Sequence, residues 1–108
     1  MKLFTKGIET KLQKQYPKGA NLDTQDVVCK IFNPCGSHTW YILNQDPNDP
    51  DYLWAIVKGV EVEMGSVLKS DLVNLRIKPF GLGLERDLSF EPTNAKEIWN
   101  KLMEGKHV

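Results

Sequence analysis

Four charged residues near the end of the chain form its densest group of side chains that could do chemistry: Glu85, Arg86, Asp87 and Glu91. If residues 88–90 form a strand, Asp87 and Glu91 lie on one face of it, because side chains alternate along a strand. Two carboxylates on one face can bind a divalent cation. A metal-dependent hydrolase or nuclease at Glu85, Asp87 and Glu91 is therefore one hypothesis. We favour a structural interpretation, in which the planar Arg86 guanidinium clasps a carboxylate.

Cys35 and His38 lie close together in a segment rich in turn residues. A cysteine beside a histidine can act as an activated nucleophile. No third group is available to orient the histidine, so we expect His38 to be exposed at the tip of a hairpin. Cys29 and Cys35 fit neither a disulfide framework nor the spacing of a zinc site. Both are therefore predicted to be reduced, and no metal ion or cofactor is expected.

Aromatic and basic residues suggest a second kind of chemistry. Trp40 and Tyr41 lie on a predicted strand, and outward aromatic side chains on a sheet can stack nucleic-acid bases. Residues 1–20 contain five lysines and one glutamate, a local basic excess. A nucleic-acid-binding protein that uses these lysines and strand aromatics is therefore an alternative. Aromatic residues in strands are more often part of the core.

The hydrophobic pattern predicts an α+β fold, with one antiparallel sheet of four to five strands and the N- and C-terminal helices packed on one of its faces. Residues 5–16 and 95–103 have helical periodicity, with Thr5 and Asn94 as N-caps. The remaining elements are strands at 27–32, 38–43, 52–58, 60–64 and 88–90, a polar loop at 44–51, a bulge or close approach at Gly65, and a short helix at 71–76 capped by Ser70.

Composition limits the classes of protein that the chain can represent. A length of 108 residues with 41% hydrophobic residues predicts one domain, residues 1–108, with its own core. The 14 basic and 14 acidic residues balance, which argues against a dedicated duplex-DNA binder. The first residues lack the apolar run of a signal peptide. We therefore expect a cytoplasmic protein without a membrane partner.

Three stretches, residues 39–42, 63–72 and 84–92, together resemble the bacterial domain of unknown function 2958 family. The resemblance implies a short protein of plasmids, phages and integrated mobile elements, with no established activity. Arg86, Asp87 and Glu91 match the charged motif of the family, in which they have no assigned role. We therefore predict an accessory, non-catalytic module whose partner is another protein, with binding residues Arg86, Asp87, Glu91, Trp40 and Tyr41.

Overall fold

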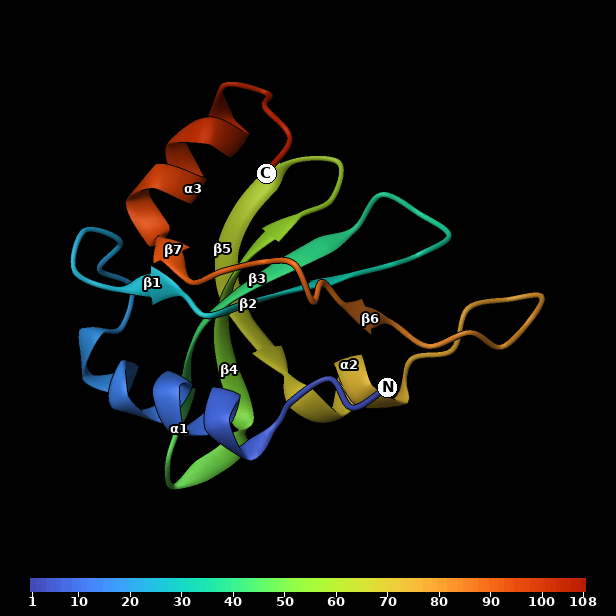
Figure 1. Ribbon diagram of the computed structural model, residues 1–108, viewed down its shortest axis with the longest axis horizontal. Coiled ribbons are helices and arrows are strands. Elements are labelled where there is room, and N and C mark those ends of the chain that lie inside the picture. Colours follow the sequence, from blue (N-terminus) through green and yellow to red (C-terminus); the bar gives the residue numbers. More distant parts are fainter.

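The computed structural model describes residues 1–108 and has an α+β fold (Figure 1). The helices are α1 (Lys6–Lys14), α2 (Lys69–Asn74) and α3 (Ala95–Met103), with a 3-10 turn at Tyr16–Lys18. The strands are β1 (Asp26–Val27), β2 (Cys29–Phe32), β3 (Thr39–Asp46), β4 (Asp49–Lys58), β5 (Val62–Leu68), β6 (Glu85–Arg86) and β7 (Thr93–Asn94). None of the helices combines the length and the apolar character needed to span a bilayer.

The main sheet has five antiparallel strands, as the sequence predicted, and their order is β5-β4-β3-β2-β6. The prediction of a single sheet is wrong, because β1 and β7 form a separate two-stranded sheet. In it Asp26 pairs with Asn94 and Val27 pairs with Thr93. Because Asn94 directly precedes α3, this pairing fixes where α3 begins on the sheet.

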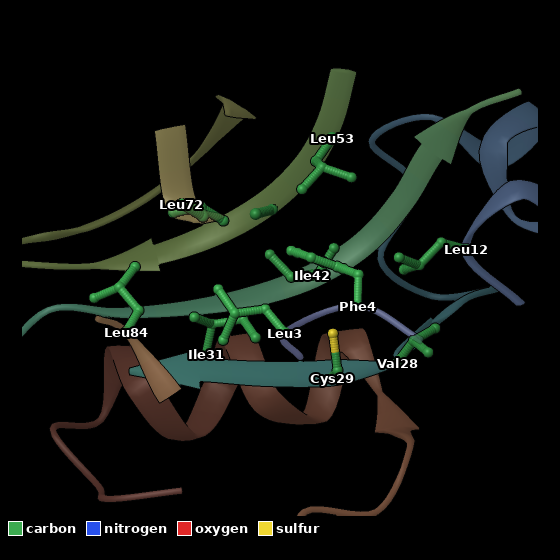
Figure 2. Close-up of a cluster of buried hydrophobic side chains, with 11 residues drawn as sticks. Leu3, Phe4, Leu12, Val28, Cys29, Ile31, Ile42, Leu53, Leu72 and Leu84 are labelled. Atoms are coloured by element: carbon green, nitrogen blue, oxygen red, sulfur yellow. The ribbon is translucent and has the colours of Figure 1, made fainter. Parts of the chain in front are cut away.

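The expectation that all helices pack on one face is also wrong, because they cover both faces of the sheet. One buried cluster contains Leu12 of α1 and Leu72 of α2, together with Ile42 of β3 (Figure 2). The other contains Ile98 of α3 together with Tyr41 of β3. Tyr41 and Ile42 are adjacent in β3 and therefore point to opposite faces. We call the two sides the α1/α2 face and the α3 face.

The segment predicted as a polar loop at 44–51 is a hairpin in which β3 runs to Asp46 and β4 starts at Asp49. Two buried amides explain why strands tolerate this composition. Asn44 donates to the main-chain oxygen of Gly19 at 2.9 Å, and Gln45 donates to the main-chain oxygen of Pro50 at 2.6 Å. Buried polar groups are tolerated when they are paired in this way.

The irregularity predicted at Gly65 lies instead in β3, between Ile42 and Asn44. Gly65 pairs regularly with Ala55 and has no heavy atom within 4 Å of where a Cβ would lie. The extra residue in β3 is Leu43, whose main-chain oxygen accepts a hydrogen bond of 2.6 Å from the Gln15 side chain. A bulge is stabilised when a side chain satisfies the main-chain groups that it leaves unpaired.

Two further local predictions are wrong. Helix α2 begins at Lys69, and Ser70 does not cap it. The Asp51 carboxylate of β4 accepts hydrogen bonds from both the main-chain nitrogen and the hydroxyl of Ser70, at 2.7 Å and 2.9 Å. The sixth strand is Glu85–Arg86, whereas residues 88–90 lie in a turn in which the Asp87 side chain accepts from the Ser89 nitrogen at 2.9 Å.

Candidate functional site

Arg86 binds main-chain oxygens and does not clasp a carboxylate. Its Nη1 atom donates to the main-chain oxygens of Lys2 and Leu3 at 2.9 Å and 2.8 Å. Its main-chain nitrogen also donates to the Met1 sulfur at 3.2 Å. These contacts hold the N-terminal segment against β6, so this segment covers the β6 edge of the sheet.

Asp87 and Glu91, by contrast, do not share a strand face. Asp87 pairs with the Lys30 ammonium at 3.7 Å and its main-chain nitrogen donates to the Lys30 oxygen at 2.9 Å. Glu91 is exposed beyond the turn. No three His, Cys, Asp or Glu side chains come together to form a metal site. The hydrolase hypothesis therefore lacks the ligand set on which it depended.

Trp40 and Tyr41, the two predicted aromatic site residues, lie on opposite faces. Tyr41 is only 2% exposed and donates its hydroxyl to the Val108 main-chain oxygen at 3.0 Å. Burial, with the nearby Asp87 charge, raises the pKa of Tyr41 to about 12. Trp40 is partly buried on the α1/α2 face, where its ring lies 5.8 Å from the exposed His38 ring. Of the two, only Trp40 has surface that a ligand could reach.

The two cysteines are free and in different environments, as predicted for reduced thiols. Cys29 is buried in the core, and Cys35 is exposed. Burial raises the pKa of the Cys29 thiol to about 12, although the Arg86 charge opposes this rise. A thiol with this pKa is almost entirely protonated at neutral pH and is not a nucleophile.

The largest hollow, about 700 Å³, lies between the N-terminal segment, α2 and residues 82–85. Two of its three basic side chains, those of Lys69 and Arg76, are already engaged, and the third, Lys2, is exposed. Lys69 is ion-paired with Glu9, and Arg76 donates to the main-chain oxygens of Val73 and Leu75 at 3.0 Å and 2.8 Å. Size alone therefore does not make this hollow the best candidate site.

Glu9 is the centre of a polar network that joins α1, β3 and α2. Its carboxylate accepts hydrogen bonds from Lys69 and from the fully buried Gln45. Burial acts to raise the pKa of Glu9, but these hydrogen bonds and the Lys69 charge outweigh burial and leave it lowered. Because each of these groups has a partner within the protein, the network is structural.

Strand β5 forms one edge of the main sheet. Strand β5 pairs with β4 in unbroken register from Val62 to Leu68 and has no strand on its other side. Apart from the pairing with β4 and the start of α2 at Leu68, no main-chain hydrogen bond involves residues 62–68. The strand has no lysine, proline or bulge, three of the devices that usually keep an edge from pairing with another chain, and its one charged residue is Glu63. We call this side of β5 the open edge.

A hollow of about 310 Å³ adjoins the open edge, between β5 and α2. Its apolar lining comes from Trp40, Val67, Leu68, Leu72 and Leu75, with Ser66 and Asp71 at its polar parts. Leu68 is 45% exposed and Leu75 is 37% exposed. We call this hollow the edge groove. It places a shaped apolar surface directly beside unpaired main-chain groups.

A family model described as "Protein of unknown function (DUF2958)" matches residues 3–106. The chain belongs to this family. No curated protein and no solved structure matches the chain. The family therefore supports the resemblance seen in the sequence and assigns no activity to any residue of this DUF2958 member.

The sequence analysis found Trp40 but missed the open edge and the rest of the edge groove. The alternation of Val62 and Met64 with Glu61 and Glu63 predicted a strand at this position, so part of the signal was present. What the pattern could not supply was the strand order, which leaves β5 without a second neighbour. Strand order depends on pairing between distant segments.

Proposed function

We propose that this protein is a non-catalytic binding module that accepts an extended segment of another protein as an added strand along β5. The open edge is the observation that carries the proposal. Seven residues in unbroken register present a row roughly 23 Å long of unpaired main-chain donors and acceptors. Main-chain hydrogen bonds supply affinity in strand addition, and neighbouring pockets select side chains.

The two edges of the sheet differ in a way that supports the proposal. At β6, a strand of two residues, the Arg86 main-chain nitrogen is covered by Met1. At β5, exposed apolar side chains flank the unpaired edge, including Val60, Leu68 and Leu75. Exposed apolar surface beside an open edge is typical of an interaction site. We therefore expect Arg86 and Asp87 to support the fold and Trp40 to contribute to binding.

Other roles have less support. The nucleic-acid alternative depended partly on Tyr41, which is buried, although Lys6, Lys11 and Lys14 remain exposed on α1. An accessory role in bacterial mobile elements, which the family resemblance implies, is compatible with a small protein that acts through contacts. That role stays a prediction.

The test is selection of a phage-displayed library of random seven-residue peptides on the purified protein. Because N–H groups alternate in direction along a strand, either Ser66→Pro or Val67→Pro removes an outward N–H and leaves the pairing with β4 intact. The variant that keeps the pairing with β4 will have the higher melting temperature of the two. We call it the edge-blocked variant.

We expect selected peptides to bind the wild type and the exposed-surface control Met103→Lys, but to lose at least tenfold in affinity for the edge-blocked variant. Peptides that bind the edge-blocked variant equally well would overturn the proposal. Dimerisation of the protein through β5, measured by light scattering and lost in the edge-blocked variant, would show that the edge serves a second copy instead.

A further inference from the structure

We infer that the segment bound along β5 presents a basic side chain, a large ring and an aliphatic side chain at alternate positions toward the α1/α2 face. This inference rests on the proposed strand addition and specifies its partner. Strand β5 directs Glu63, Gly65 and Val67 to this face, because they pair with Val57, Ala55 and Leu53, and these last three pack in the α1/α2 cluster. An added strand places every second side chain beside these three residues.

The charge on this side of β5 favours a basic partner. Glu63 is exposed on β5, and Asp71 lies in the edge groove. Neither belongs to any of the four ion pairs of the protein. Lys69, the nearest basic residue on this side along the chain, is paired with Glu9, and Lys58 pairs in register with Val62, which packs on the α3 face. The partner residue beside Glu63 therefore meets unneutralised negative charge.

Gly65 leaves space for a large ring. No heavy atom lies within 4 Å of the position that its Cβ would take, and its cross-strand neighbour Ala55 is also small. Its φ is not positive, unlike those of Gly19, Gly81 and Gly105, so the backbone conformation does not require glycine here. Aromatic side chains cover exposed glycine on a neighbouring strand. The backbone at Gly65 is therefore a surface on which such a ring can pack.

The third side chain of the bound segment, the one beside Val67, is apolar because it faces the edge groove. Val67 forms one wall of the groove, and Trp40 and Leu72 form others. An aliphatic side chain beside Val67 removes apolar surface from water on both partners. The three positions together distinguish this partner from a generic extended peptide, whose side chains would be interchangeable.

The test uses fluorescein-labelled synthetic heptapeptides, with threonine at odd positions and lysine, tyrosine and valine at positions two, four and six. The reverse order is also made, because the added strand can run in either direction. Matched peptides replace lysine by glutamate or tyrosine by alanine. Fluorescence anisotropy measures binding to the wild type, the edge-blocked variant, Glu63→Lys/Asp71→Lys, Gly65→Trp and the control Gly65→Ala, with thermal melting to verify folding.

We expect the lysine peptide to bind the wild type about fivefold to tenfold more tightly than the glutamate peptide. We expect Glu63→Lys/Asp71→Lys to reverse this order. Replacing the tyrosine of the peptide by alanine should weaken its binding to the wild type. The same replacement should have little effect on binding to Gly65→Trp, because the tryptophan ring already occupies the space beside residue 65.

Two outcomes separate the inference from the proposed function. If library-selected peptides depend on the open edge but show no preference for lysine or tyrosine, the inference fails and strand addition stands. If the edge-blocked variant binds every peptide as well as the wild type does, both fail. If no synthetic heptapeptide binds the wild type, the inference fails. Strand addition is then tested by the selection of library peptides alone.

Discussion

The Arg86 guanidinium donates a hydrogen bond to the main-chain oxygen of Leu3 at 2.8 Å, so residues far apart in the sequence are fastened together at the edge of the sheet. Leu3 is itself buried in the α1/α2 cluster. Arg86 therefore stabilises the covering of β6 by the N-terminal segment. It does so at the edge of the sheet opposite to β5.

Replacing Arg86 by alanine should lower the free energy of unfolding by about 1.5–3 kcal/mol, because hydrogen bonds from a charged group are lost. Urea denaturation measures the change. Arg76→Ala is the matched control, since the Arg76 bonds to Val73 and Leu75 are exposed and local. The control should change stability by less than about 0.5 kcal/mol. Unchanged stability in Arg86→Ala, with loss of peptide binding, would instead make Arg86 a binding residue.

Gly65→Ala should raise the free energy of unfolding by about 0.4–1 kcal/mol, because the unfolded chain loses conformational freedom and the new Cβ meets no atom. Gly105→Ala should have the opposite effect, by about 1–2 kcal/mol, because the φ of Gly105 is 77°. Thermal and urea denaturation of both variants test the pair. Destabilisation by Gly65→Ala would mean that the space beside Gly65 is not open.

The lowered pKa of Glu9 predicts a loss of stability in acid. Because the folded pKa lies below the unfolded value, the stabilisation is present above the unfolded pKa and is lost as pH falls through the folded pKa. Glu9→Gln should therefore have a flatter pH dependence of the unfolding free energy than the wild type below about pH 5. The control is Glu97→Gln, whose ion-paired side chain is 52% exposed. If the unfolding free energies of Glu9→Gln and the wild type fall equally steeply in acid, the prediction is contradicted.

The two thiols should differ in reactivity. At pH 8 and in the folded protein, Cys35 should react with Ellman's reagent, while Cys29 should stay protected because its pKa is about 12 and it is buried. Absorbance should report one thiol per chain in buffer and two in guanidinium chloride. In Cys35→Ser, rapid reaction of the folded protein would show that the core around Cys29 opens.

Leu102→Ala should cost about 2–5 kcal/mol of stability, because it empties a site in the α3 cluster where Leu102 is 3% exposed. Its neighbour Met103 is 61% exposed, so Met103→Ala should change stability by less than about 0.5 kcal/mol. Equal effects in urea denaturation would mean that α3 docks with a different face than the structure shows.

Local chemistry made some elements predictable. Thr5 caps α1 by accepting from the Ile8 nitrogen at 3.2 Å, and Asn94 caps α3 by accepting from the Glu97 nitrogen at 3.1 Å, as the sequence predicted. Each cap lies three residues from its donor, so no distant residue is needed to form it. Ser70 had the same local signature but binds Asp51 of β4 instead. A distant carboxylate replaced the local cap.

The sequence by itself determined the α+β class, most of the strands and the points at which the terminal helices begin, because periodicity and capping act over a few residues. Only the tertiary structure decided which strand is left without a neighbour, which face each helix covers and what Arg86 binds. These depend on contacts between distant residues, such as Leu3 with Arg86 and Asp51 with Ser70. The candidate site belongs to this second group, because an open edge exists only once all the other strands have been paired.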